Sequence, residues 1–219
     1  MSARAPKLSA ALIGAALVAS CAGGPKPLDW QLEAKGAMER AVAAWLEGNG
    51  RVERAEMAIV RSRLARTGRT DLLAGAELLA CAARTASLVF EPCARFEALR
   101  RDATAAQRAY ADYLRGALPP QAFALLPEPQ RAAATGNPGA IAGIADPLSK
   151  LVAAGALLQA GKAGPEVIGE AIDTASRQGW RRPLAAWLGV QARRAELAGR
   201  TEEAAALRRR IALTQGGFE

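Results

Sequence analysis

Apolar residues recur at helical spacing along most of this chain. The first such run starts at Asp29, which we expect to be an N-cap, and it ends at the turn Gly48-Asn49-Gly50. Its apolar positions, spaced three or four residues apart, are Trp30, Ala34, Ala37, Ala41 and Trp45. No segment shows the alternation typical of a β-strand. The pattern therefore predicts an all-α fold, with further helices over residues 51–67, 71–86, 93–99, 102–114, 147–161, 165–178, 183–197 and 201–215.

One type of turn occurs three times, as Gly-Arg-Val-Glu at 50–53, Gly-Arg-Thr-Asp at 68–71 and Gly-Arg-Thr-Glu at 199–202. We expect Gly68 to take the left-handed conformation that ends a helix, and Thr70 to cap the helix that follows. Any antiparallel pair of helices can use such a turn.

Two of these turns have small residues at fixed distances from the glycine. Ala55 and Ala204 lie five positions after it, and Ala43 and Ala192 lie seven before it. This spacing resembles the tetratricopeptide (TPR) helical hairpin, in which small residues let two antiparallel helices approach closely. No regular 34-residue period connects the copies. The resemblance implies a bundle or short stack of TPR-like antiparallel hairpins.

Residues 119–146 differ in composition from the rest of the chain. They hold five of the chain's 12 prolines and the sequence Gly-Asn-Pro-Gly at 136–139, with room for one short helix between 120 and 126. We expect this segment to connect an N-terminal helical subdomain, residues 29–118, to C-terminal helical hairpins, residues 147–219.

The first 21 residues form a leader. Arg4 and Lys7 precede an apolar run from Leu8 to Val18, which at about 11 residues is too short for a transmembrane helix and is typical of a secretory signal. The alternatives are an ordinary cleaved signal with a coincidental cysteine, or an uncleaved anchor.

The end of the leader, Val18-Ala19-Ser20-Cys21, resembles the lipobox of bacterial lipoproteins. That resemblance implies cleavage after residue 20, and attachment of diacylglycerol and an acyl chain such as palmitate at Cys21. Residues 21–28 would then be a flexible tether. Because Ala22 rather than aspartate follows the cysteine, the resemblance implies the outer membrane, at its periplasmic face.

Cleavage would leave 199 of the 219 residues and, with the loss of Arg4 and Lys7, lower the formal net charge from +8 to +6. A basic chain can bind anions such as lipid A phosphates or phospholipid headgroups. The simpler interpretation is that the arginines are solvated on helix faces. Nucleic acid is not an expected partner, because the chain has no recognition motif and the leader predicts export.

Cys81 and Cys93 are the two cysteines outside the leader. In an oxidising compartment such a pair predicts a disulfide, although two buried free thiols are the alternative. Twelve residues of continuous helix would hold the pair about 18 Å apart, whereas a disulfide needs Cα atoms about 5.5 Å apart. The helix must therefore end near Ala86, and residues 87–90 must turn back. The spacing does not match the Cys-x-x-Cys of redox proteins.

The chain has no histidine. This excludes Ser-His-Asp and Cys-His nucleophile systems and removes the commonest zinc ligand. Glu166, Glu170 and Asp173 share one predicted helix face and are the best acids for a cell-wall-acting enzyme, but a solvated helix face is the better explanation for them. We expect no enzyme activity, no catalytic residue, no metal and no cofactor.

The segment from Gln178 to Trp187 combines tryptophan and arginine between two predicted helices. These residue types are enriched in binding hot spots, so Trp180, Arg181 and Arg182 are the candidate partner-binding residues. The alternative is that Trp180 packs on the core.

With the lipobox and the cysteine pair, the Gly179–Pro183 segment resembles proteobacterial outer-membrane lipoproteins, a resemblance that supplies no activity. We expect a non-enzymatic scaffold or accessory protein whose partner is another envelope protein or peptide. The alternatives are a binder of an anionic envelope component (lipid A, phospholipid or peptidoglycan) and, third, the cell-wall enzyme.

Overall fold

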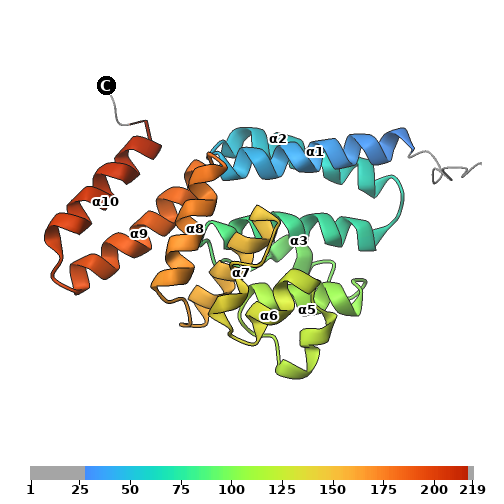
Figure 1. Ribbon diagram of the computed structural model, residues 1–219. Coiled ribbons are helices and arrows are strands. Elements are labelled where there is room, and N and C mark those ends of the chain that lie inside the picture. The colour runs from blue at the N-terminus through green and yellow to red at the C-terminus, as the bar shows by residue number, and fades with distance from the viewer. Residues whose placement is uncertain (1–27, 217–219) are drawn as a thin grey trace, which may run out of the picture.

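The computed structural model describes residues 28–216, and every regular element in that range is helical. The predicted all-α fold is thus confirmed (Figure 1). The leader, the lipid-attachment residue Cys21 and all but the last residue of the predicted tether lie outside the described residues. The elements are α1 (Asp29–Leu46), α2 (Gly50–Ala65), α3 (Thr70–Ala86), α4 (Ala94–Glu97), α5 (Ala105–Leu114), η1 (Pro120–Leu125), α6 (Glu128–Ala134), η2 (Pro138–Ala140), α7 (Pro147–Gln159), α8 (Pro165–Arg177), α9 (Arg181–Leu197) and α10 (Thr201–Thr214).

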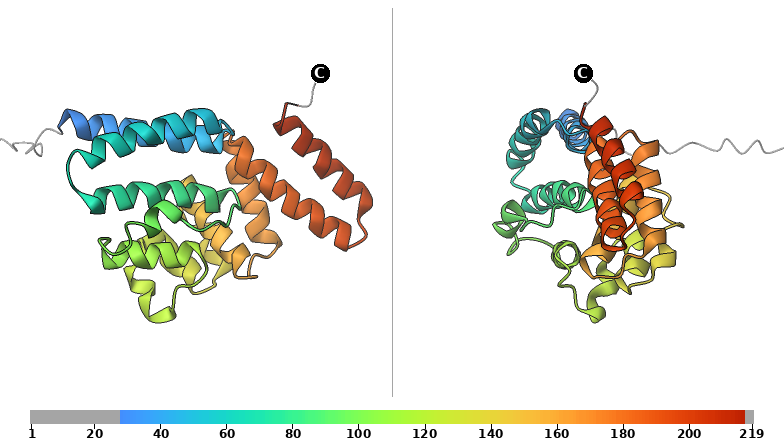
Figure 2. Two further views of the ribbon diagram at one scale, coloured as in Figure 1. Left: turned by 180° about the vertical axis from the view of Figure 1, so that it is seen from behind. Right: turned by 90° about the vertical axis from the view of Figure 1, so that its left-hand side faces the viewer.

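Two antiparallel hairpins flank a central group of helices. The hairpin α1–α2 and the hairpin α9–α10 extend in opposite directions from the place where α1 ends and α9 begins (Figures 1 and 2). Between them α3 packs on α1, α5 and α7, and α7 in turn packs on α6 and α8. The expected antiparallel hairpins are therefore present at both ends of the described chain.

The small residues of the TPR-like pattern behave differently in the two hairpins. In α9–α10 both Ala192 and Ala204 are buried, as the pattern requires. In α1–α2 the corresponding Ala55 is exposed, and α2 turns Met57 and Val60 toward the core instead. Membership of the TPR class stays a prediction.

The main core runs continuously from α3 to α10. Its largest fully buried side chains include Phe96, Leu151 and Trp187. Leu126 and Ile141, from the segment expected to be a connection, are buried in the same core. Residues 119–146 thus pack as part of the core, through Ala133 of α6 and through the apolar residues that follow η1 and η2.

A close backbone contact holds α3 against α7. A Cβ atom added at Gly155 of α7 would lie 2.5 Å from the backbone oxygen of Thr85 in α3. Only glycine fits at this crossing, since any side chain would force the two helices apart. The crossing matters for the site below, because α3 and α7 both contribute to its floor.

The disulfide Cys81–Cys93 is present, with Cα atoms 6.0 Å apart. As the geometry required, α3 ends at Ala86 and the chain turns back at once. Leu88 adopts the left-handed conformation (φ 59°), and the Val89 N–H donates to the Arg84 carbonyl. The turn therefore returns the chain to α3 and brings the start of α4 beside it.

Several predicted helix starts were wrong by one to three residues. Asp29 is the first helical residue of α1 and not its N-cap, because the preceding Leu28 N–H donates to the Gln31 side chain. Thr70 likewise lies inside α3, one residue after the N-cap. The helix expected from residue 102 begins at 105, where Thr104 and Gln107 form a reciprocal capping box.

Candidate functional site

The candidate residues Trp180, Arg181 and Arg182 lie at the start of α9. The prediction placed both arginines between helices, but α9 begins at Arg181 and Trp180 is its N-cap. The arginines are therefore held on the first helical turn. Their side chains line a different hollow from the one that Trp180 lines, so the three side chains do not form one cluster.

Arg181 and Arg182 reach the C-terminal end of α1. The Arg181 Nε donates to the Glu47 carbonyl at 3.0 Å, and the Arg182 Nε donates to the Trp45 carbonyl at 2.7 Å. α1 has no basic residue in its own last turn. The two arginines supply the positive charge that stabilises the negative end of a helix dipole.

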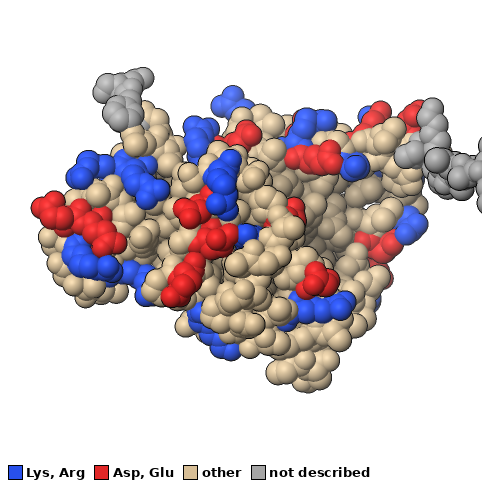
Figure 3. Space-filling model, in the orientation of Figure 1, with Lys and Arg blue, Asp and Glu red and all other residues tan. Residues whose placement is uncertain are grey.

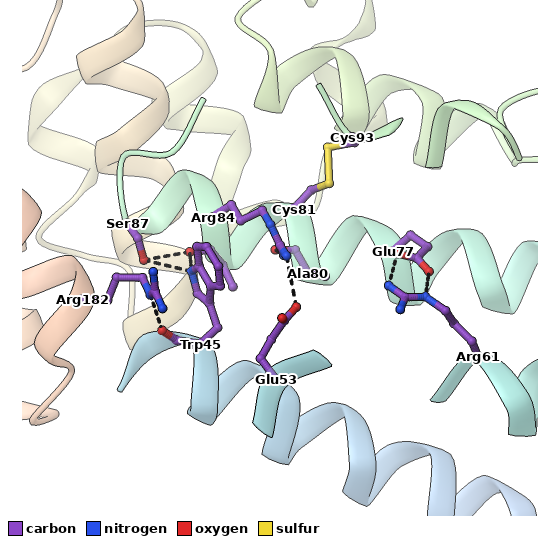
Figure 4. Close-up of polar contacts among 11 residues, drawn as sticks. Trp45, Glu53, Arg61, Glu77, Ala80, Cys81, Arg84, Ser87, Cys93 and Arg182 are labelled. Carbon is purple, nitrogen blue, oxygen red and sulfur yellow. Dashed lines mark hydrogen bonds and ion pairs between the residues drawn. A yellow bond between two sulfur atoms is a disulfide. The ribbon is translucent and has the colours of Figure 1, made fainter. Parts of the chain in front are cut away.

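The Trp45 indole lies between two guanidinium groups (Figure 4). The Arg182 guanidinium carbon is 3.9 Å from the ring centroid and that of Arg84 is 4.4 Å away. The indole N–H donates to the Ala83 carbonyl at 3.0 Å and to the Ser87 hydroxyl at 3.2 Å. Trp45 therefore joins the end of α1 to the end of α3 and the start of α9.

Buried carboxylates form ion pairs with the arginines that lie between α2 and α3, on one side of this junction. Glu53 of α2, which is 5% exposed, accepts from Arg84 at 3.1 Å. Glu77 of α3 accepts two bonds from Arg61 of α2, at 2.6 and 3.0 Å, and these pairs bind α2 to α3 (Figure 4). Among the described residues no carboxylate pairs with Arg182. Burial and the neighbouring Arg84 lower the pKa of Arg182, and Glu53 only partly opposes them.

Trp180 faces an apolar groove of about 500 Å³, which we call the Trp180 groove. One wall is α1, and the floor comes from α3 and α7. The lining residues are Lys35, Met38, Glu39, Val42, Ala43, Leu46, Leu79, Leu148 and Trp180. At its rim Lys35 and Glu39 form an ion pair at 3.6 Å. In the view of Figure 3 the surface below α1 is hollowed and largely free of charged side chains.

The apolar surface continues on the other side of Leu79. A second hollow of about 400 Å³ lies between α3, α5 and η1, where Leu78, Tyr110 and Leu125 are among the lining residues. Leu79 lines both hollows and is 38% exposed. The two hollows therefore form one apolar strip across α3.

Leu79 is the principal residue of this surface that the sequence analysis missed. It follows the buried Leu78 in an apolar stretch of α3, so the helical period alone gives it no distinct role. A leucine just outside the buried face of a helix was the available signal.

The acidic trio on α8 is divided between structural and solvent-exposed positions. Glu170 pairs with the buried Lys150 at 2.5 Å and with Arg177 at 3.7 Å. Glu166 and Asp173 are exposed. Within residues 28–216 no group of three or more His, Cys, Asp and Glu side chains is placed to hold a metal ion.

No family model matches the chain, and no curated protein or solved structure is significantly similar to it. In the part of the chain that the structure describes, no helix has both the length and the apolar character needed to cross a bilayer.

Proposed function

We propose that this chain is a non-enzymatic accessory protein of the bacterial envelope that holds a segment of another envelope protein in the Trp180 groove. Attachment would be through lipid on Cys21, in the outer membrane and at its periplasmic face. The observation that carries the proposal is the apolar strip centred on Leu79, which is open to solvent and has the Lys35–Glu39 ion pair at one rim. Exposed contiguous apolar surface of this kind marks interaction sites.

The shape of the strip favours an amphipathic helix as the bound segment. Helix-lined grooves bind such helices by taking apolar side chains spaced three, four and seven residues apart. Two hollows separated by Leu79 offer places for two such anchors. Lys35 and Glu39 at the rim can form ion pairs with charged side chains on the polar face of the segment.

The position of the groove is consistent with a tethered protein. Its first lining residue, Lys35, is six residues after the start of α1, a distance of about 9 Å along the helix axis. The predicted tether ends at the same helix terminus. The groove would thus lie close to the membrane that carries the anchor, where a membrane protein's exposed segment is within reach.

Site-specific photocrosslinking in cells tests this proposal. A photoreactive amino acid replaces Leu79 in the full chain, and the matched control places it at Leu213 of α10, which is 47% exposed and lies outside the strip. We expect a discrete crosslink to one envelope protein from position 79 and none from 213.

The captured segment then provides the quantitative test. A synthetic peptide of the crosslinked segment should bind the purified full chain, and Leu79→Glu should weaken that binding at least tenfold while Leu213→Glu leaves it unchanged. A charge placed against a buried apolar anchor costs several kcal/mol, which is more than the roughly 1.4 kcal/mol of a tenfold change. If Leu79→Glu and Leu213→Glu weaken peptide binding equally, the segment does not bind in the Trp180 groove.

A further inference from the structure

A third hollow lies on the other side of the Trp180–Arg182 segment, and its lining is much more polar than that of the Trp180 groove. It has a volume of about 440 Å³ and lies between the end of α1, the start of α9 and the end of α10. We call it the arginine cleft. Its polar side chains are those of Glu47, Arg181, Arg182, Thr214 and Gln215. It shares no lining residue with the Trp180 groove.

The two guanidinium groups in the cleft have unused donors. Each arginine donates its Nε hydrogen to a carbonyl of α1. The terminal nitrogens of both have no hydrogen-bond acceptor, and neither arginine forms an ion pair, among residues 28–216. The Nε bonds fix the plane of each group, so the remaining N–H donors are preorganised.

The surroundings of the cleft are positive. Its lining holds two arginines, Arg181 and Arg182, and one acidic side chain, that of Glu47. The start of α9 has no side-chain cap, so the positive end of its dipole is not neutralised locally. The carboxylate of Glu47 is the opposing charge in the lining, and it is exposed and bonded to neither arginine.

We propose that the arginine cleft binds a phosphate group through the terminal nitrogens of Arg181 and Arg182. Guanidinium groups bind phosphate oxygens in bidentate pairs, and two of them match an anion that carries more than one charge. A free phosphate compound and a lipid headgroup would make the same contacts here. The site is independent of the partner proposed for the Trp180 groove.

Calorimetric titration of the full chain in non-ionic detergent tests the proposal, with inorganic phosphate as the probe and acetate as the comparison. Arg181→Gln should weaken phosphate binding about tenfold, the effect of losing one charge-assisted hydrogen bond. Glu47→Gln removes the opposing carboxylate and should strengthen binding. It keeps the backbone carbonyl that holds Arg181. Arg182 is not the primary variant, because its side chain also supports Trp45.

Arg66→Gln is the matched control, because Arg66 is an exposed arginine of the α2 C-terminus with no ion pair among the described residues. If the Arg181 and Arg66 substitutions weaken phosphate binding equally, the effect comes from the net charge of the protein, and the proposed site is wrong. Equal binding of acetate, or no binding of phosphate, would overturn the assignment to phosphate.

Vesicles distinguish the two sources of phosphate. If phosphatidic acid vesicles, and not phosphatidylcholine vesicles, retain the protein in an Arg181-dependent way beyond the effect of Arg66→Gln, the phosphate is a headgroup. Binding of inorganic phosphate without such retention supports a free phosphate compound.

Discussion

Replacing Gly155 with alanine should have two opposing effects on stability, a gain in helix propensity and a steric overlap with α3. Alanine stabilises a helix interior by about 1 kcal/mol relative to glycine. At Gly155, however, the new Cβ would lie 2.5 Å from the Thr85 backbone oxygen, which cannot rotate away. Overpacking of this kind costs roughly 1–3 kcal/mol. We expect Gly155→Ala to leave the protein between equally stable and about 2 kcal/mol less stable.

Gly169 of α8 is the matched control, because a Cβ added there meets nothing within 4 Å. Gly169→Ala should therefore raise the free energy of unfolding by about 1 kcal/mol. Urea denaturation of the full chain, with the disulfide intact, measures both variants. If Gly155→Ala stabilises the protein as much as Gly169→Ala does, then α3 and α7 can separate freely and our account of their crossing is wrong.

Three further predictions concern the stability of the fold. Replacing both Cys81 and Cys93 with serine should lower the free energy of unfolding by about 3 kcal/mol, the chain-entropy effect of so short a loop, measured by urea denaturation. The hydrogen bonds from Arg100 lower the pKa of Glu97, so this pair stabilises the fold above about pH 4.3 and that stability is lost as the pH falls through the lower pKa of the folded state. Thermal melts between pH 7 and 3 should show a smaller acid-induced loss for Glu97→Gln, and an unchanged profile would contradict this reasoning. Trp187→Phe should cost about 1–3 kcal/mol in the same denaturation assay, because the fully buried indole donates to the last carbonyl of α3 at 3.1 Å. A cost near zero would show that this carbonyl finds another donor.

Local sequence signals predicted the helices well, because helix period and glycine turns act within a few residues. Gly68 has φ 64°, and α3 ends within the range that the disulfide geometry required. The errors in the helix starts were also local. The Leu28 N–H donates to the side chain of Gln31, three residues later in the chain, so Asp29 is not needed as a cap. Such competition between neighbouring side chains is not resolved by residue preference alone.

The candidate site depended on contacts that local sequence does not encode. Arg182 donates to the Trp45 carbonyl, 137 residues earlier in the chain. That bond exists only because α8 and α9 return the chain to the end of α1. The segment Gly179–Pro183 could be identified as unusual by its residue types, but not the direction in which each side chain points. The exposed strip around Leu79 likewise requires α1, α3, α5 and α7 to be assembled.

The N-cap and first turn of α9 place an apolar side chain in one surface hollow and two cationic ones in another, so the hypothesis of a single site divides into two. If both proposals hold, Trp180→Ala should weaken binding of the groove peptide and leave phosphate binding unchanged, and Arg181→Gln should do the reverse. The two effects should be separate because the two hollows share no lining residue, although the start of α9 holds side chains of both. Far-UV circular dichroism and thermal melts would establish that each variant is folded. If either folded variant loses binding of both the peptide and phosphate, the two hollows are coupled through α9.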